Sequence, residues 1–328
     1  MKGYQFEDTQ GTFHLKKAEN ISYLYFPIAG EAGLKSSLTP NLGGDAKIDQ
    51  NTFLLEPVSA ENLVNNRNSR NFWCNVKGIG SWSLTGNAAE ALSKKFTEMQ
   101  DDSEVTAGFM WQTTTRESKK YQLRGEILSF IPVEKNVEVM LVTITNTGRM
   151  AQTVTPTAAI PLYGRSADNI RDHRHVTSLL HRIETTDTGV LVTPTLSFDE
   201  RGHQVNHMTY YCVGWSGNGE KPVDFYPTAE DFVGEGGNFE RPYAIVKKAE
   251  GVKAGTRIEG LEAVGGLHFS EVTLEPEEEC SYLIFTGITE DIQEIRNLSK
   301  TYTTREMVLE ELEKTKAYWQ EKVNVAYH

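Results

Sequence analysis

The sequence predicts a mainly β protein, in which a large antiparallel β-sandwich is followed by a C-terminal helical linker. Three observations support this fold class. Residues 1 to about 290 form a series of short segments rich in β-branched and aromatic residues, separated by turn-forming residues. No segment of helical period lies between these strands, which argues against a βαβ arrangement. Residues 290–325 then change to a helical period.

The strand-like segments are short and regularly punctuated. The clearest are Thr106–Thr115, Gln122–Pro132, Val137–Thr145, Thr153–Ile160, Gly189–Thr195 and Cys280–Thr286. Turns are indicated at Asn146–Gly148, Asp187–Gly189 and Asn218–Gly219. In the Val137–Thr145 segment, both alternating sets of side chains are largely apolar, so both faces of this strand should be covered, as in a two-sheet sandwich.

The C-terminal segment predicts a helix that starts near Thr304. Val308, Leu312, Thr315, Trp319 and Val323 recur at helical spacing and therefore share one face. We divide the chain accordingly into a sandwich, residues 1–289, and a helical linker, residues 290–328. Periodicity alone leaves two interpretations open: the helix connects to a further domain, or it packs on its own sandwich.

Composition narrows the possible partners. A net charge of -12 and a pI near 5.2 argue against nucleic-acid binding, because no basic face could neutralise several phosphates. The longest apolar runs have strand length, so no membrane span is expected, and the N-terminus lacks the apolar core of a signal peptide. Three widely spaced cysteines suit reduced, mostly buried thiols. We therefore expect a cytoplasmic protein.

One segment is strongly basic within this acidic chain, Tyr163 to Arg182, which reads YGRSADNIRDHRHVTSLLHR. We call it the Arg/His segment. Guanidinium and imidazole groups suit an uncharged polyol or an anion. The candidate substrate-binding residues here are Arg165, Asp168, Asn169, Arg171, His173 and Arg174. The alternative is a self-satisfied network, in which Asp168 and Asp172 pair with the arginines and brace a long loop.

A second candidate stretch runs from Asn65 to Asn87 and combines amides, arginines and indoles. Arg70 and Trp73 are the candidate glycan contacts, because amides, guanidinium forks and flat aromatic faces match the edge and face of a sugar. The alternative places Phe72, Trp73 and Trp82 in the core of adjacent strands.

Other candidate chemistry is weaker. Asp199 and Glu200 could act as a carboxylate pair, but beside Arg201 they are better explained as a turn with a salt bridge. His173 and His175 have the spacing of a ligand pair, yet the nearby arginines would repel a dication, so no metal is expected. No catalytic motif can be assembled, and no catalytic residue is assigned.

Three segments carry a family resemblance: NSRNFWCNVKGIGSWSLTGN, TAAIPLYGRSADNIRDHRHVTSLLHR and TLSFDERGH. They resemble the N-terminal part of glycoside hydrolase family 94 phosphorylases, in the branch of 1,2-β-oligoglucan phosphorylase and the phosphorylase-like part of cyclic β-1,2-glucan synthases. The resemblance covers essentially the whole chain. It implies a supersandwich, a helical linker and then an (α/α)6 barrel, which this chain lacks.

The resemblance also implies a function. The barrel of such enzymes holds the general-acid Asp and the phosphate-binding groups, so this chain alone should be inactive. Its implied role is at the substrate entrance and in assembly, in a homo-oligomer or with a separate barrel chain. The full enzyme would act on β-glucooligosaccharides with inorganic phosphate or glucose 1-phosphate as co-substrate and no cofactor. Two other interpretations are a stand-alone carbohydrate-binding module and a complete hydrolase or mutarotase-like enzyme, which needs a convergent His/Glu pair.

Overall fold

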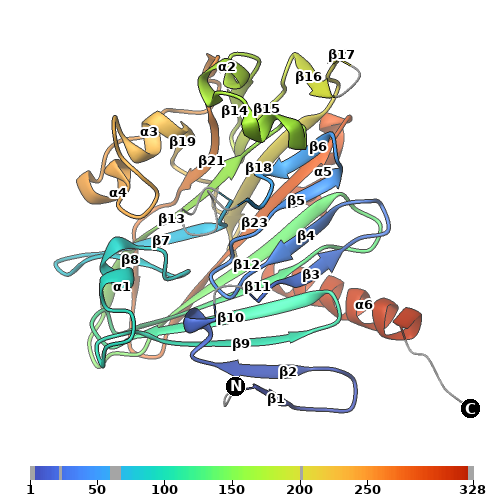
Figure 1. The fold of residues 1–328 in the computed structure, drawn as a ribbon. Helices are drawn as coiled ribbons and strands as arrows, with labels where there is room; N and C mark the ends of the chain where they lie inside the picture. The colour runs from blue at the N-terminus through green and yellow to red at the C-terminus, as the bar shows by residue number, and fades with distance from the viewer. Residues whose placement is uncertain (1–3, 22–23, 60–67, 200–201, 324–328) are drawn as a thin grey trace, which may run out of the picture.

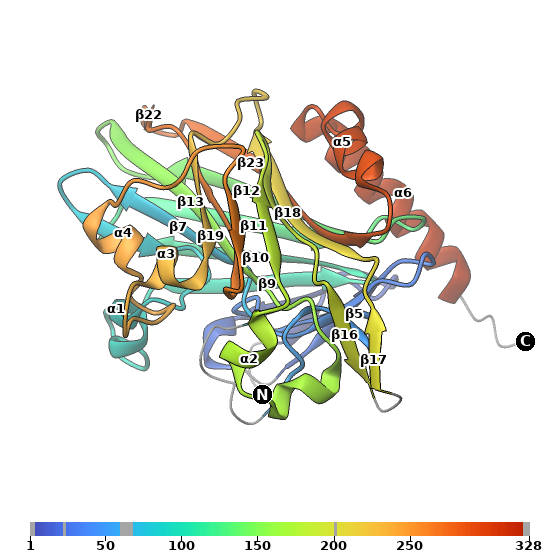
Figure 2. The same ribbon diagram turned by 90° about the horizontal axis from the view of Figure 1, so that it is seen from above.

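The computed structural model describes residues 4–21, 24–59, 68–199 and 202–323. Within these ranges, an eleven-stranded and a six-stranded antiparallel sheet pack against each other (Figures 1 and 2). A four-stranded sheet and a two-stranded hairpin flank them. This arrangement confirms the predicted fold class, a mainly β protein built on a large antiparallel sandwich with a helical C-terminal segment.

The eleven-stranded sheet has the order β1-β2-β9-β10-β11-β12-β23-β18-β15-β14-β20. Its strands are β1 (Tyr4–Phe6), β2 (Phe13–Lys16), β9 (Asp102–Gly108), β10 (Trp111–Ser118), β11 (Leu123–Phe130), β12 (Val137–Asn146), β23 (Glu279–Thr289), β18 (Thr209–Ser216), β15 (Gly189–Val192), β14 (Arg182–Thr185) and β20 (Arg257–Glu259). The six-stranded sheet has the order β19-β21-β13-β7-β8, with β22 also paired to β13. Its strands are β19 (Asp224–Thr228), β21 (Ala263–His268), β13 (Gln152–Leu162), β7 (Asn71–Val76), β8 (Gly80–Ser83) and β22 (Val272–Leu274).

The remaining elements are short except for the last two helices. The four-stranded sheet contains β3 (Phe26–Ala29), β4 (Lys35–Leu38), β5 (Ala46–Asp49) and β6 (Thr52–Leu55), and the hairpin contains β16 (Leu196–Asp199) and β17 (Gly202–Val205). The helices are η1 (Ala18–Asn20), α1 (Ala89–Ser93), η2 (Ala167–Arg171), α2 (Arg174–Ser178), α3 (Ala229–Val233), α4 (Tyr243–Lys247), α5 (Ile292–Thr301) and α6 (Arg305–Val323).

The main core lies between the two large sheets. Met140, Val142 and Ile144 of β12 point into it, together with Phe72 of β7 and Leu267 of β21. Alternate residues of each strand face this core, because successive side chains of a β-strand point to opposite faces. Burial of these apolar side chains supplies the main driving force for closing the sandwich.

Helices cover both outer faces of the sandwich, which gives four layers (Figure 2). On the eleven-stranded sheet, Val137, Val139 and Leu141 pack with residues of α5 and α6. All ten residues of β12 are therefore buried, which confirms that both of its faces are covered. The sequence predicted the cover of a two-sheet sandwich. In the structure, the six-stranded sheet covers one face of β12, and the helices α5 and α6 cover the other.

The predicted strands are found at or near their expected positions, with one exception. Thr106–Thr115 is not a single strand, since β9 ends at Gly108 and β10 begins at Trp111. The turn between them contains Met110 in the left-handed region, with φ 62. An added Cβ at Gly108 would lie 2.5 Å from the Trp111 Nε1 atom, so the indole closes over a glycine. The turn lacks the Asn-Gly or Asp-Gly pair that usually marks a tight hairpin, so no sequence pattern indicated that this strand divides in two.

The predicted C-terminal helix is two helices, α5 and α6, with a break at residues 302–304. The start near Thr304 is confirmed, since α6 begins at Arg305, and Val308, Leu312, Thr315 and Trp319 are buried as predicted. Val323 instead remains 36% exposed. The Trp215 Nε1 atom donates to the backbone oxygen of Tyr302 at 2.9 Å, which fastens the break to β18.

Candidate functional site

The Arg/His segment connects β13 to β14 across one end of the sandwich and contains η2 and α2 (Figure 1). The β16–β17 hairpin lies beside it in both views (Figures 1 and 2). The Ser166 hydroxyl donates to the backbone oxygen of Phe198 in β16, so the segment and the hairpin are in contact. The chain also pairs with β6, because the amide of Phe53 donates to the backbone oxygen of Arg165 at 3.0 Å.

Arg165 lies at the inner side of this segment and is 6% exposed. Its two terminal nitrogens lie 3.4 and 3.3 Å from the Glu262 Oε1 atom, and its guanidinium carbon lies 5.1 Å from the centre of the Tyr163 ring. The adjoining hollow, which also includes Glu56 and Phe239, has a volume of about 20 Å³. A hollow of that size holds a water molecule and not a sugar ring. Arg165 therefore anchors the segment to the β20–β21 connection.

Asn169 also has a structural role. Its side-chain oxygen accepts from the Ser166 amide at 3.3 Å and from the Ser166 hydroxyl at 3.1 Å, and its amide nitrogen donates to Asp172 at 2.8 Å. Ser166 is the residue that caps η2, so these bonds satisfy backbone groups at the start of that helix. Asn169 is 5% exposed and fixes the conformation of the loop.

His181 lies near the C-terminal end of the segment, inside the fold, and is 1% exposed. Its Nδ1 atom donates to the backbone oxygen of Leu261 at 3.2 Å. Burial, followed by the positive charge of Arg165, lowers the pKa of His181 to about 3. The imidazole is therefore neutral at physiological pH and does not add to the positive charge of this end.

The other side of the segment faces solvent. Asp168, Arg171 and His173 are exposed, and two apolar side chains of the same segment, Val176 and Leu179, are 63% and 60% exposed. Arg174 is the first residue of α2, and its side chain lies outside the described residues. One half of the segment therefore braces the loop, through the contacts of Arg165 and Asn169, and the other half faces solvent. The predicted role of the segment in substrate binding stays a prediction.

The second candidate stretch is separate from the first, and its two candidate residues, Arg70 and Trp73, lie inside the fold. Arg70 is 1% exposed and pairs with Glu138, while Trp73 is 2% exposed and packs beneath α3 and α4. Their burial does not fit the predicted contact with a glycan. The alternative of a core position, which was predicted for Phe72, Trp73 and Trp82, describes Trp73, and Arg70 is likewise buried. The part of the stretch from Asn65 to Arg67 lies outside the described residues.

The third stretch forms the β16–β17 hairpin, in which Asp199 is paired with Gly202. A turn was predicted at this position, but Glu200 and Arg201, the rest of its proposed salt bridge, lie outside the described residues. Within the hairpin, the rings of Phe198 and His203 meet edge to face, with centroids 4.3 Å apart. The contact of this hairpin with Ser166 was not predicted, because nothing in either segment specifies a long-range pairing.

The cysteine thiols are unsuited to nucleophilic chemistry. Cys74 and Cys212 are buried, and Cys280 is partly buried. Burial raises the pKa of Cys212 to about 12 and that of Cys280 to about 11, and it also raises the pKa of Cys74 well above its ordinary value. In the described part of the chain, no group of three or more His, Cys, Asp or Glu side chains could hold a metal ion. No helix in the described ranges combines the length and the apolar character that crossing a membrane requires.

Two antiparallel sheets with helices on both outer faces define the class of large β-sandwich domains. The family model of the glycosyl hydrolase 94 supersandwich domain matches residues 57–305. The chain belongs to this family. No curated protein matches the chain.

Among solved structures, one similar chain is described as a kojibiose phosphorylase from human microbiome, with 9% identity and a TM-score of 0.48 over 97% of this chain and 39% of that chain. A bacterial glucoamylase complexed with acarbose has 9% identity and a TM-score of 0.45 over 98% of this chain and 38% of that chain. An aldose 1-epimerase structure from Escherichia coli K12 has 9% identity and a TM-score of 0.42 over 81% of this chain and 99% of that chain. The present chain thus spans about 39% of the kojibiose phosphorylase chain that it matches.

Proposed function

We propose that this chain is the non-catalytic N-terminal domain or subunit of an inverting β-glucan phosphorylase. The proposed enzyme releases α-glucose 1-phosphate from β-glucooligosaccharides with β-1,2 linkages. The observation that carries the proposal is the family match over residues 57–305. The motifs that resemble the 1,2-β-oligoglucan phosphorylase branch support the linkage.

In the proposed reaction, inorganic phosphate attacks the anomeric carbon directly, and an Asp of the barrel protonates the leaving glycosidic oxygen. The bond between the anomeric carbon and that oxygen breaks as the bond to phosphate forms, with inversion. Phosphate is the nucleophile, so no residue of the present chain has to act as a base. The contribution of the sandwich is to position the oligosaccharide, which lowers the entropic part of the barrier.

Within this proposal, the exposed half of the Arg/His segment lines the substrate entrance. Asp168, Arg171 and His173 are exposed, and Arg174 starts the adjoining helix α2. Arg165 and Asn169 act beneath them by holding the loop in place. Charged donors on a braced loop suit sugar hydroxyls and phosphate, because hydrogen bonds to charged groups are stronger than neutral ones. We also propose that the assembled enzyme is cytoplasmic and oligomeric.

The test compares the purified chain alone with the chain co-expressed with an (α/α)6 barrel. Phosphate release from glucose 1-phosphate is measured with sophorose as acceptor, and laminaribiose and cellobiose serve as linkage controls. We expect activity only in the assembled enzyme and with sophorose. Turnover by the chain alone would overturn the proposal, and binding of glucans without any activity of the mixture would favour a carbohydrate-binding module.

The loop is tested in the active assembly with Arg171→Ala and Arg174→Ala. We expect each to raise the KM for the acceptor by about tenfold, which corresponds to the loss of about 1.4 kcal/mol of binding. Arg149→Ala is the matched control, since Arg149 is exposed in the β12–β13 turn, at the opposite end of β13 from the Arg/His segment. Unchanged kinetics in both loop variants, with a lowered melting temperature, would instead assign these arginines to bracing.

A further inference from the structure

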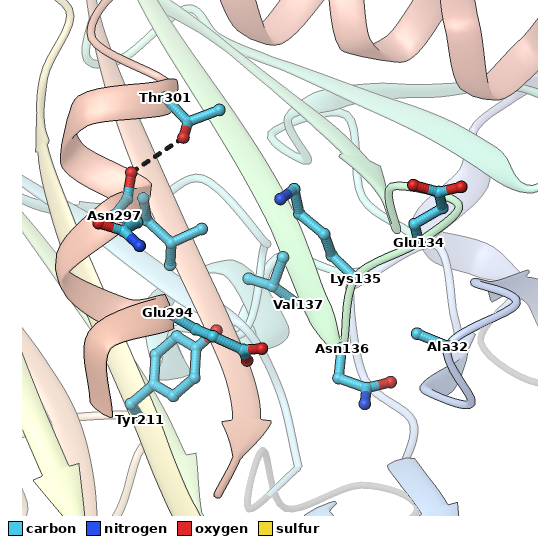
Figure 3. A pocket seen from close by; sticks show the side chains of 10 residues that line it. Ala32, Glu134, Lys135, Asn136, Val137, Tyr211, Glu294, Asn297 and Thr301 are labelled. Atoms are coloured by element: carbon cyan, nitrogen blue, oxygen red, sulfur yellow. Dashed lines mark hydrogen bonds between the residues drawn. The ribbon is translucent and has the colours of Figure 1, made fainter. Parts of the chain in front are cut away.

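We propose that a hollow between α5 and the β11–β12 connection binds a neutral polyol of the size of one monosaccharide. The hollow has a volume of about 290 Å³ (Figure 3). Small-molecule sites span about 300–1,000 Å³, so this hollow suits a single sugar ring and not an oligosaccharide. It lies on the outer face of the eleven-stranded sheet, whereas the Arg/His segment crosses the end of the sandwich (Figure 2).

The floor of the hollow is apolar. Val137, Tyr211 and Leu298 are 2%, 3% and 5% exposed and belong to the core cluster beneath α5 and α6. A pyranose ring has weakly polar C–H faces, and an aromatic and aliphatic floor can bury such a face at little cost. Burial and then the carboxylate of Glu294 raise the pKa of Tyr211, so its hydroxyl stays protonated and can donate.

The rim of the hollow is polar on both sides. Glu294, Asn297 and Thr301 lie on one stripe of α5, at the spacing that places helical residues on a common face. Glu134 and Lys135 of the β11–β12 connection form the opposite rim. Carboxylates accept, an ammonium donates, and amides do both, so this set matches hydroxyl groups, which also do both.

Hydrogen bonds fix the orientation of two side chains that line the hollow, and a third, that of Lys135, extends into it. The Glu294 Oε2 atom accepts from the Thr289 hydroxyl at 2.6 Å, which orients the carboxylate. The Asn136 side-chain oxygen accepts from the Leu34 amide at 2.9 Å and fixes the base of the connection. Figure 3 shows the Lys135 side chain extending into the space beside α5, and no ion pair of Lys135 is found among the described residues. Its ammonium group remains available to an oxygen of the ligand.

The charge of the rim distinguishes between ligand classes. Two carboxylates, Glu134 and Glu294, stand against one ammonium, that of Lys135. The rim is therefore net negative and disfavours a phosphate or carboxylate ligand. A bound sugar would contact α5 and the β11–β12 connection together, and it would hold α5 against the sandwich, because a ligand stabilises the state that binds it.

Saturation-transfer NMR and calorimetric titration of the full chain with methyl β-D-glucopyranoside test this site. For about thirteen non-hydrogen atoms we expect a Kd on the order of 1 mM. We expect Lys135→Ala and Asn297→Ala each to weaken binding by about tenfold, because each removes hydrogen bonds to the sugar. Lys300→Ala is the matched control, since Lys300 is an exposed residue of α5 outside the hollow. The Kd of the glucoside for this variant should equal that for the parent chain.

Two further measurements make the outcome decisive without any assay of activity. Hydrogen exchange should show slower exchange of the α5 amides when the sugar is present, and glucose 1-phosphate should bind more weakly than the neutral glucoside. No saturation by about 50 mM glucoside, far above the expected Kd, would overturn the proposal. Binding that survives both rim substitutions would overturn it as well, since the sugar would then lie elsewhere. Tighter binding of glucose 1-phosphate would contradict the assignment to a neutral ligand.

Discussion

Arg70 and Glu138 form a bidentate ion pair inside the sandwich. The Arg70 Nε atom lies 2.7 Å from Glu138 Oε1, and Nη2 lies 2.9 Å from Oε2. Both side chains have further partners: the Ser36 hydroxyl donates to Oε2 at 2.6 Å, and Arg70 Nη1 donates to the backbone oxygen of Gly44 at 2.7 Å. The pair therefore joins the four-stranded sheet to β12 and to the start of β7.

Glu138→Gln is expected to destabilise the chain by about 3–5 kcal/mol, because it leaves the guanidinium buried without a counter-charge. Urea unfolding followed by tryptophan fluorescence measures this loss. The double variant Arg70→Met, Glu138→Leu removes both charges and should recover much of the stability, since apolar residues of similar volume often replace a buried pair without loss. Equal stability of Glu138→Gln and the parent chain would contradict the expected role of the pair.

Arg70 also shows a limit of predicting the candidate site from the sequence, because its partner is distant along the chain. The local pattern of amides, arginines and indoles resembles a sugar-binding surface, and neighbouring sequence contains no sign of Glu138, which is 68 residues away. The same limit applies to Arg165 and Glu262, which are 97 residues apart. Partners of this kind are set by sheet topology, whereas sequence patterns report local periodicity. The concentration of basic residues in the Arg/His segment, by contrast, is visible in the local sequence alone, and its role in substrate binding stays a prediction.

His181 should make the stability of the chain depend on pH. Its pKa is lowered to about 3 in the folded chain, against 6.5 as its ordinary value. As the pH falls from about 6.5 towards 3, the unfolded chain takes up a proton that the folded chain does not. The free energy of unfolding should therefore decrease by up to about 1.4 kcal/mol per pH unit in this window.

The His181→Gln variant removes this contribution and isolates it from other titrating groups. The free energy of unfolding is measured in urea between pH 7 and pH 4.5 for the parent chain and the variant. The variant should show the shallower pH dependence, whatever its stability at pH 7. Exposed His207→Gln is the control and should follow the parent. Parallel curves for the parent and His181→Gln would contradict a neutral, buried imidazole.

Gly86 provides a test of close packing against a charged side chain. It has φ 75, and an added Cβ would lie 2.2 Å from Nη2 of Arg116, which is 1% exposed and ion-paired with Glu19. Gly78 has nearly the same φ, 78, but nothing lies within 4 Å of its added Cβ. Gly78→Ala should cost only the strain of a left-handed backbone, about 1–2 kcal/mol. Gly86→Ala should cost more, because the guanidinium must also move.

The midpoints of urea unfolding of the two alanine variants give this comparison directly. A lower midpoint for Gly86→Ala than for Gly78→Ala is the expected result, since backbone strain is matched in the pair. Equal midpoints would mean that Arg116 can shift without cost and that its ion pair contributes little.

The fold class was easier to predict than the connections. The apolar pattern on both faces of β12 and the stripe of buried residues in α6 follow directly from periodicity. The helices α1 to α4 have five residues each, fewer than two turns, so they give no periodic signal and were not predicted. Of these short helices, α1, α3 and α4 cover the six-stranded sheet, whereas α2 lies in the Arg/His segment at the end of the sandwich.

The last prediction concerns whether α6 belongs to the folding unit of the sandwich. Leu312 is 4% exposed and lies in the core cluster with Val139, Leu141 and Phe285. If α6 folds together with the sheet, Leu312→Ala should lower the global free energy of unfolding by about 2–5 kcal/mol. Met307 of the same helix is 42% exposed, so Met307→Ala serves as the control and should change stability by no more than about 0.5 kcal/mol.

Hydrogen exchange distinguishes the two possible roles of α6. In the expected outcome, Leu312→Ala accelerates exchange in α6 and in the central strands β12 and β23 to a similar degree, because all open in one cooperative step. A variant in which α6 exchanges faster while β12 and β23 remain as protected as in the parent would contradict this. The helix would then be a separable connector, held to the sandwich only by local contacts such as the bond from Trp215 to Tyr302.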